Sequence, residues 1–332
     1  MGELIDAFTV AGKAAFSFQA IFFALMAMGL NVHFGYTGLL NFGQIAFAML
    51  GGFGIAISVS KWGAPFWVGV LVGITAAVVL SLLLGIPTLR LRADYLAIVT
   101  IASSEGLRLL FRSVSATPVT GGTRGIAAFN RDFIALAPWD TSRRYNILGT
   151  TWSGGELWVC LVGWTLVVLF SLLIWALMRS PWGRVLKAIR EDEDAVRSLG
   201  KNVYSYKMQS LVLGGVLGSL AGFILALGRA AVQPDSFGTE TTFFAYTVLI
   251  LGGAARVFGP VVGAMIFWMV LSLTDNVLNQ AVDNGVISSS IMDNTQVGQV
   301  RFMLVGIALM LLMVYRPQGI FGDKRELALD VR

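Results

Sequence analysis

Long apolar runs recur along this chain, and they limit its possible folds more than any other feature. Several reach the roughly 20 residues that a helix needs to cross about 30 Å of hydrocarbon. Nine candidate spans follow: Ala14–Val32, Asn41–Ser60, Phe66–Ile86, Tyr95–Phe111, Leu157–Met178, Tyr206–Leu227, Phe243–Ala255, Pro260–Leu278 and Arg301–Tyr315. A β-barrel would instead alternate apolar and polar residues in pieces of about ten. The pattern predicts an all-α polytopic membrane protein with about nine or ten transmembrane or re-entrant helices, in one domain over residues 1–332.

The composition excludes several classes of function. Only 13% of the residues are charged, against about 25% in soluble domains. Cys160 is the only cysteine and His33 the only histidine, so a disulfide within the chain and a multi-histidine metal site are excluded. No Walker A, H-E-x-x-H or G-x-S-x-G motif occurs. We therefore predict no catalytic and no metal-binding residues. The net charge of +5 is explained by basic loops rather than by nucleic acid.

Basic residues in short loops predict the orientation in a bacterial cell membrane. They place the charged loop of about 179–205 in the cytoplasm, together with a tail of about 316–332 that carries Arg316, Lys324, Arg325 and Arg332. Arg90 and Arg92 mark another cytoplasmic turn. The loop of about 112–155 and the segment around Asp283 and Asp293 are then external. The side of Met1 stays open, because it depends on whether 41–60 is a full or a re-entrant span.

The charged loop is amphipathic and lies between two long apolar runs. A carrier driven by an ion gradient usually has carboxylates near mid-span, and these span interiors are almost free of them. An external energy source is therefore favoured, with the charged loop as its docking segment. The candidate coupling residues are Arg184, Lys187, Arg190, Glu191, Asp192, Asp194, Arg197 and Gly200. The alternative is a solvated amphipathic helix at the lipid surface.

A second unusual segment runs from Gly29 to Gly54 and contains seven glycines. Glycine-broken helices with polar side chains are tolerated at membrane depth where they are buried or line a wet cavity. The candidates for lining a substrate path are Asn31, Tyr36, Asn41 and Gln44. A turn between two ordinary helices is the alternative. His33 is interpreted as a packed or interfacial histidine rather than a proton relay.

Glycines four residues apart share one helix face and allow close helix packing. Gly214, Gly218 and Gly222 form one such set, and Gly259 and Gly263 form a second pair. Packing within the chain and packing against another subunit both remain possible. Glu105, Arg108 and Arg112 share a face of another span, where a surface ion pair and a functional group are both possible.

Seven blocks resemble the LivM-type permease of branched-chain amino-acid ABC importers, whose family also holds LivH-type, urea and ribose permeases. They are GLNVHFGYTGLLNFGQIAF (29–47), LRLRADYLAIVT (89–100), TGGTRGI (120–126), GRVLKAIREDEDAVRSLGKNVYSYK (183–207), VQPDSF (232–237), VLILGGAARVFGPVVGA (248–264) and YRPQGIFG (315–322). The segment from Asp194 to Gly200 also has the spacing of the E-A-A-x-x-x-G loop that docks onto ATPases in this family. The chain departs from the pattern at Asp194, where a small apolar residue is common, and its external loop is somewhat long.

This resemblance implies the ABC importer permease fold and a set of partners. They are a second, LivH-like permease, two cytoplasmic ATPases and an extracytoplasmic substrate-binding protein. ATP and magnesium would belong to the ATPases, so no cofactor is expected in this chain. Leucine, isoleucine and valine are the expected substrates, and urea, short amides or other amino acids are the alternatives. A secondary transporter driven by an ion gradient is the rival class.

Overall fold

The computed structural model describes residues 2–89, 93–147, 149–284, 294–315 and 319–322. Arg90, Arg92, Asp293, Arg316, Lys324, Arg325 and Arg332, which entered the orientation argument, lie outside these residues. The longer helices are α1 (Gly2–Phe16), α2 (Phe18–Leu30), α3 (Gln44–Ser60), α4 (Phe66–Thr88), α5 (Ala93–Arg112), α8 (Gly154–Arg179), α9 (Pro181–Glu191), α11 (Val203–Arg229), α12 (Glu240–Gly252), α13 (Gly259–Asp283) and α14 (Asn294–Tyr315). A π-helix, η1 (Asn31–Tyr36), continues α2 without a gap.

The described part of the chain confirms the all-α polytopic prediction. Among the residues that the structure describes, five helical segments are long and apolar enough to cross a membrane: Phe18–Tyr36, Phe66–Thr88, Gly154–Arg179, Val203–Arg229 and Gly259–Asp283. Three shorter apolar helical stretches accompany them, at Ala7–Phe16, Gln44–Ser60 and Glu240–Gly252. Within the described ranges, strands are limited to two small pairs in the connecting loops.

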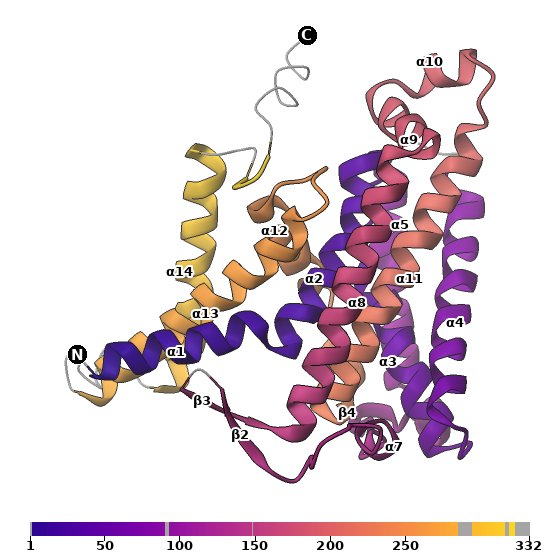
Figure 1. Cartoon of the computed structure of the whole chain (residues 1–332). Coiled ribbons are helices and arrows are strands. Elements are labelled where there is room, and N and C mark those ends of the chain that lie inside the picture. Colours follow the sequence, from indigo (N-terminus) through magenta and orange to yellow (C-terminus); the bar gives the residue numbers. More distant parts are fainter. Residues whose placement is uncertain (1, 90–92, 148, 285–293, 316–318, 323–332) are drawn as a thin grey trace.

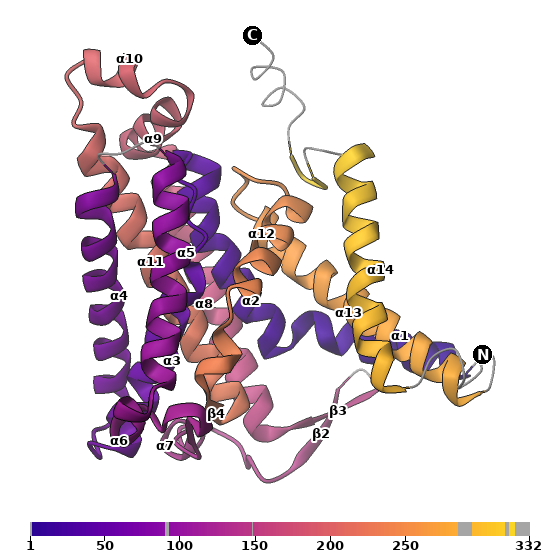
Figure 2. The ribbon, with the colours of Figure 1, turned by 180° about the vertical axis from the view of Figure 1, so that it is seen from behind.

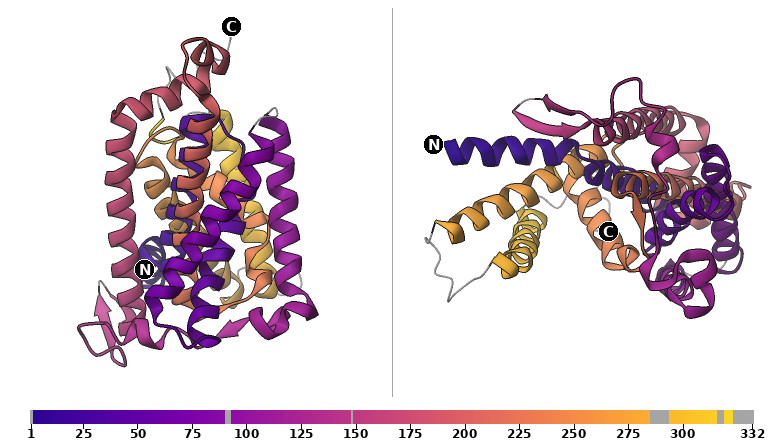
Figure 3. Two further views of the ribbon diagram at one scale, coloured as in Figure 1. Left: turned by 90° about the vertical axis from the view of Figure 1, so that its right-hand side faces the viewer. Right: turned by 90° about the horizontal axis from the view of Figure 1, so that it is seen from below.

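The helices form a bundle with an arm on one side. Helices α2, α3, α4, α5, α8 and α11 run side by side, whereas α1, α13 and α14 splay away from them (Figures 1 and 2). The view from below shows this separation most clearly (Figure 3). The charged helices α9 and α10 (Glu193–Ser198) cap one end of the bundle, here called the α10 end. The short α6 (Thr117–Thr120) and α7 (Arg131–Ile134) lie at the opposite end, here called the α7 end.

Helices α2 and α11 make up the centre of the bundle. Every residue of α2 from Ala20 to Leu30 is buried, as is most of the second half of α11. A helix that is apolar on all sides is expected in the interior of a bundle. The outer helices α4 and α8 instead leave large side chains exposed, including Leu71, Leu83 and Val168. Such exposed apolar faces are suited to contact with lipid.

The first predicted span, Ala14–Val32, is wrong at its start. Ser17 has an extended backbone with ψ of 163°, and its hydroxyl accepts the N–H of Ala20, so a new helix begins at Phe18. This is the N-capping role that serine commonly fills. The preceding α1 turns away and packs along α13 (Figure 1). An apolar run that looks continuous in sequence therefore contains two helices.

Four other predicted spans also have different limits. The span predicted at Phe243–Ala255 is α12, which ends at Gly252 because Gly253 has φ of +105°. The span predicted from Asn41 begins at Gln44, and residues 37–43 form an irregular connection after η1. The span predicted at Arg301–Tyr315 starts seven residues late, because α14 begins at Asn294, and the span predicted at Pro260–Leu278 ends five residues before α13 does. The other predicted spans lie within about three residues of the observed helices.

The loop between α5 and α8 contains small elements. Its 3-10 turns are η2 (Val114–Ala116) and η3 (Gly122–Arg124), and its strands are β1 (Ile126–Ala127), β2 (Arg144–Ile147) and β3 (Thr150–Ser153). Strands β2 and β3 form a hairpin. Strand β1 pairs with β4 (Ala231–Val232), which follows the C-terminal end of α11. A 3-10 turn, η4 (Pro234–Phe237), follows β4. Gly125, with φ of +70°, allows the close approach, because a Cβ there would lie 1.9 Å from the Val232 carbonyl oxygen.

The segment after α14 completes the end of α12. The N–H of Ile320 donates to the Leu251 carbonyl at 2.9 Å, and that of Phe321 donates to the Gly252 carbonyl at 3.3 Å. The last carbonyls of a helix have no partner within the helix. Residues 319–322 therefore satisfy two groups that α12 leaves open.

We expect Gly319→Ala to detach this segment. Gly319 has φ of +74°, and a Cβ there would lie 2.3 Å from the Ile250 carbonyl oxygen. Hydrogen–deuterium exchange should show faster exchange at Ile320 and Phe321. Gly306→Ala is the matched control, because nothing lies within 4 Å of its Cβ position. Unchanged exchange in Gly319→Ala would contradict this account.

Candidate functional site

The charged loop folds as two short helices that dock on the bundle through one face. Helix α9 starts with Pro181 at its first turn, a favoured position because proline lacks the N–H that would be unpaired there. Its buried residues are Gly183, Leu186 and Ile189, spaced three apart on one face. Trp182 Nε1 donates to Gln209 Oε1 of α11 at 2.7 Å. The opposite face is left to solvent.

A break at Asp192 separates α9 from α10. The Asp192 carboxylate accepts the N–H groups of Asp194 and Ala195, both at 2.9 Å, and so caps α10. Arg197 pairs with Glu193 and Asp194, each at 2.9 Å. Such exposed ion pairs add little stability. Their charges therefore remain accessible to a partner.

All eight predicted coupling residues lie on this exposed surface. They are Arg184, Lys187, Arg190, Glu191, Asp192, Asp194, Arg197 and Gly200. Beyond α10, the Leu199 side chain is 80% exposed, and Gly200 turns the chain with φ of +76°. An apolar tip surrounded by charges is typical of a surface that meets another protein.

Arg190 is exposed as well, but its guanidinium reaches back to the broken helix. Its Nη1 donates to the Gly35 carbonyl oxygen of η1 at 2.6 Å. Gly38, with φ of +74°, lies against the same side chain, and a Cβ there would lie 3.4 Å from Arg190 Cγ. The charged loop is thus attached to the broken helix by a charge-assisted hydrogen bond.

The broken helix is attached in turn to the loop between α12 and α13. Asn31 Nδ2 donates to the Arg256 carbonyl at 2.8 Å, and Asn31 Oδ1 accepts the Ala255 N–H at 2.8 Å. Gly35 packs closely on this contact, since a Cβ there would lie 2.1 Å from Asn31 Oδ1. The amide side chain therefore uses both its donor and its acceptor in holding two distant segments together.

A second polar cluster fixes the connection before α3. Asn41 Nδ2 lies 3.1 Å from His33 Nδ1 and donates to Gln44 Oε1 at 3.0 Å. His33 Nε2 lies 3.2 Å from the Leu211 carbonyl, so the ring is assigned as the neutral Nε2–H tautomer. Gln44 Nε2 donates to the Gly214 carbonyl at 2.8 Å. All three side chains are completely buried.

The four predicted path residues therefore lie in three different places. Asn31, Asn41 and Gln44 are buried, and each makes hydrogen bonds within the protein. Tyr36, at the end of η1, lines a cavity of about 490 Å³ at the α10 end. The structure brings three of these residues into hydrogen-bonded clusters and leaves one at a cavity wall.

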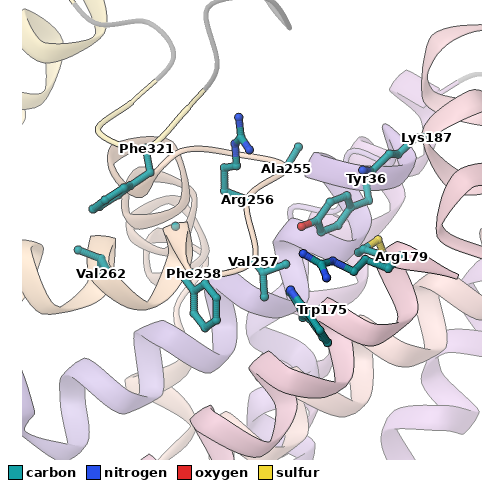
Figure 4. Close-up of a pocket in the computed structure, with 12 residues that line it drawn as sticks. Tyr36, Trp175, Arg179, Lys187, Ala255, Arg256, Val257, Phe258, Val262 and Phe321 are labelled. Atoms are coloured by element: carbon teal, nitrogen blue, oxygen red, sulfur yellow. The ribbon is translucent and has the colours of Figure 1, made fainter.

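This cavity is where the charged loop, the broken helix and the α12–α13 loop meet. Lys187 lies over the Tyr36 ring at 5.8 Å, and the Arg179 guanidinium lies over the Trp175 ring at 4.1 Å. Both cationic side chains extend toward Tyr36, and Arg256 projects from the facing loop (Figure 4). Sequence reasoning did not single out Trp175 or Arg256. Trp175 lies near the end of an apolar run, and Arg256 lies within the block at 248–264 that carries the resemblance.

The predicted glycine faces make close contacts within the chain. A Cβ at Gly214 would lie 2.1 Å from His33 Nε2, and one at Gly222 would lie 1.8 Å from the Ala48 carbonyl oxygen. Gly218 faces Gln44 and Phe47 of α3. Gly259 and Gly263 pack against the backbone of Gly252 and its neighbours in α12. These faces are therefore occupied inside this chain.

The third set of charged candidates lies toward the α7 end. Arg108 bonds to Glu105 and also to Asp235 of η4, with Nη1 2.8 Å from the Asp235 carboxylate. Arg112 lies 3.5 Å from the same carboxylate. The sequence analysis singled out Glu105, Arg108 and Arg112 but not Asp235. Asp235 is 127 residues away from Arg108. They fasten η4 to α5.

Comparisons with known proteins all find permease proteins of transport systems. The family described as "Branched-chain amino acid transport system / permease component" matches residues 14–314. The high-affinity branched-chain amino acid transport system permease protein LivM of Escherichia coli K12 is 30% identical over 312 residues, 91% of this chain and 68% of that protein. A probable branched-chain amino acid transport permease protein LivM of Methanocaldococcus jannaschii is 25% identical over 334 residues, 90% of each chain. The autoinducer 2 import system permease protein LsrC of Photorhabdus laumondii is 31% identical over 117 residues, 33% of this chain and 35% of that protein.

Proposed function

This chain belongs to the family of branched-chain amino acid transport system permease components, and on that premise we propose that it is the permease subunit of an ATP-driven importer. The proposed substrates are leucine, isoleucine and valine. The chain forms part of a transporter complex with other subunits. It contributes half of the translocation path and transmits the force of the ATPases. The attachment of an exposed charged loop to a broken intramembrane helix, through Arg190, is the observation that carries this proposal.

The proposed complex has the composition expected for this family. A second, LivH-like permease completes the path, two cytoplasmic ATPases hold ATP and magnesium, and an extracytoplasmic binding protein delivers the substrate. The α10 end then faces the cytoplasm, together with the C-terminus. Basic residues near the α10 end support this orientation. Nucleic acid has no role.

The contacts suggest how movement is transmitted. Closure of the ATPases displaces α9 and α10 through their exposed charged surface. Arg190 carries the displacement to Gly35 in η1, and Asn31 carries it onward to the α12–α13 loop. The π-helix is the element that yields, because such segments are rare interruptions of α-helices and frequently occur at functional sites. The spans beside η1 then tilt between an inward-open and an outward-open state.

A secondary carrier is the rival function, and the charges in the spans do not favour it. Asp275 lies inside α13, but Arg301 of α14 neutralises it at 3.0 Å. A proton- or sodium-coupled carrier generally relies on a carboxylate whose charge changes during transport. Permeases for urea, short amides or other amino acids are rivals within the same family, and a substrate screen separates them.

A pull-down followed by reconstitution tests the proposal. The chain is purified from native membranes in mild detergent, and co-purifying proteins are identified by mass spectrometry. We expect two ATPases and a second permease, and ATP-dependent uptake of leucine when the binding protein is added to proteoliposomes. Uptake by the lone chain under a proton or sodium gradient would support the secondary carrier instead. Uptake of urea but not of leucine would change the substrate.

A further inference from the structure

A second cavity lies at the α7 end, apart from the coupling contacts. It has a volume of about 160 Å³ and is enclosed by α2, η4, α12, α13 and the last turns of α11. Pockets for drug-sized ligands measure about 300–1,000 Å³, so this one is suited to a molecule of amino-acid size. In an importer with the α10 end in the cytoplasm, it lies on the side from which substrate enters.

The walls of this cavity are mainly apolar. Phe23 of α2, Phe244 of α12 and Phe267 of α13 form an aromatic group, with ring centroids 6.1 Å apart for Phe23 and Phe267 and 6.2 Å apart for Phe244 and Phe267. Leu225 and Leu271 line it as well. Such a wall favours an aliphatic side chain, because contact removes apolar surface from water.

A single cation lies at the edge of this apolar wall. Arg229 is the last residue of α11, and the following Ala230 turns the chain with φ of +52°. None of the described residues that line the cavity is acidic. Arg229 also makes no ion pair with any carboxylate in the described part of the chain. A guanidinium in this setting is suited to bind a carboxylate with two hydrogen bonds.

An unused donor of α13 lines the same cavity. Trp268 Nε1 is buried and has no hydrogen-bond acceptor among the described residues. Buried donors are nearly always paired, so an unpaired one calls for a partner. The indole N–H is a donor only, so its partner must be an acceptor such as a carboxylate. Arg229 and Trp268 thus require the same kind of group.

We propose that this cavity is a binding site for the transported amino acid. The substrate carboxylate accepts hydrogen bonds from the Arg229 guanidinium and Trp268 Nε1, and the aliphatic side chain packs on the three phenylalanines. The hydroxyl oxygens of Ser236 and Thr241, which also line the cavity, are acceptors for the ammonium group. This inference rests on the proposed function, and it assigns part of the substrate selection to the permease itself.

The test measures binding of labelled L-leucine to the purified membrane complex without its soluble binding protein. We expect Arg229→Gln to weaken binding roughly 10- to 100-fold, the effect of losing a charged hydrogen-bond partner. Trp268→Phe keeps the ring and removes only the N–H, and should weaken binding about 2- to 10-fold. Arg131→Gln is the control, because Arg131 lies in α7 at the same end but does not line the cavity.

Competition by two leucine analogues separates a binding role from a structural one. The 2-oxo acid of leucine keeps the carboxylate and the aliphatic chain, and it should displace leucine. The amine 3-methylbutylamine lacks the carboxylate and should not. In Arg229→Gln this preference should disappear, whereas a merely structural change would leave it in place. Equal competition by the two analogues in the wild-type complex would overturn the inference.

The outcomes distinguish this inference from the proposed function. A wild-type complex that imports leucine but shows no saturable binding without its binding protein removes only the cavity assignment. The same holds if Arg229→Gln binds and imports leucine as the wild type does. A complex that imports no branched-chain amino acid, with all partners present, removes the proposed function itself.

Discussion

Arg190→Ala should uncouple ATP hydrolysis from transport. The substitution removes the 2.6 Å bond to the Gly35 carbonyl, which attaches the charged loop to the broken helix. A hydrogen bond from a charged group contributes about 1.5–3 kcal/mol, so α9 would move without carrying η1 with it. In reconstituted complexes we expect leucine uptake to fall about 10-fold or more, while the ATPases still bind and hydrolyse ATP.

Two variants give this prediction its controls. Arg144→Ala removes an exposed arginine of β2, at the opposite end of the bundle and outside the coupling contacts, and it should leave the ATP cost of each imported leucine unchanged. Arg190→Lys keeps a donor that can reach Gly35 and should recover part of the uptake. Loss of the ATPases from the Arg190→Ala complex would instead place Arg190 in the docking surface. Normal uptake would remove it from the coupling route.

Gly222→Leu should cause the largest loss of stability among single glycine substitutions in α11. Even a Cβ would lie 1.8 Å from the Ala48 carbonyl oxygen and 2.6 Å from the Ala48 carbonyl carbon. These are backbone atoms of α3, so no side chain can move aside, and the two helices must separate. Overpacking of a core typically costs about 1–3 kcal/mol, and this contact belongs at or above the upper limit. The measurement is thermal unfolding of the purified chain in detergent.

Gly106→Ala is the matched control, since it is also an intrahelical glycine. Nothing lies within 4 Å of its Cβ position in α5, and alanine is the better helix former by about 1 kcal/mol. It should unfold at the same temperature as the wild type or slightly above. Equal effects of Gly222→Leu and Gly106→Ala would mean that the α3–α11 contact does not limit stability.

Hydropathy and glycine spacing predicted much of the fold, because both are local signals. A span is visible as an apolar run, and the face of Gly214, Gly218 and Gly222 follows from the helical repeat. The break between α1 and α2 was not visible, since it depends on the single serine at position 17. The hydrogen bonds between residues 319–322 and the end of α12 were not visible either, because they use backbone groups only.

The candidate sites likewise combine features that the sequence predicted with features that it did not. The charged loop was evident from composition, but the contact of the Arg190 guanidinium with Gly35 depends on how α9 docks against η1. The polar residues of the broken span were visible in the sequence as candidates, and the structure buries Asn31, Asn41 and Gln44. Their hydrogen-bond partners lie far away in the chain: Asn31 meets Arg256, 225 residues later. The cavity at the α7 end had no sequence signal, because Arg229 and Trp268 belong to different helices and neither lies in a motif.

The hydrogen bonds that complete the end of α12 also have a consequence for biogenesis. The Leu251 carbonyl accepts its hydrogen bond from Ile320, which is synthesised 69 residues later. At synthesis rates of about 5–20 residues per second, that interval lasts about 3–14 s. During this time α12 has emerged with open carbonyls that lipid cannot satisfy. The end of α12 therefore stays incomplete until residues 319–322 have been synthesised and have returned to it, so completion of α12 is timed by translation rather than by its own sequence.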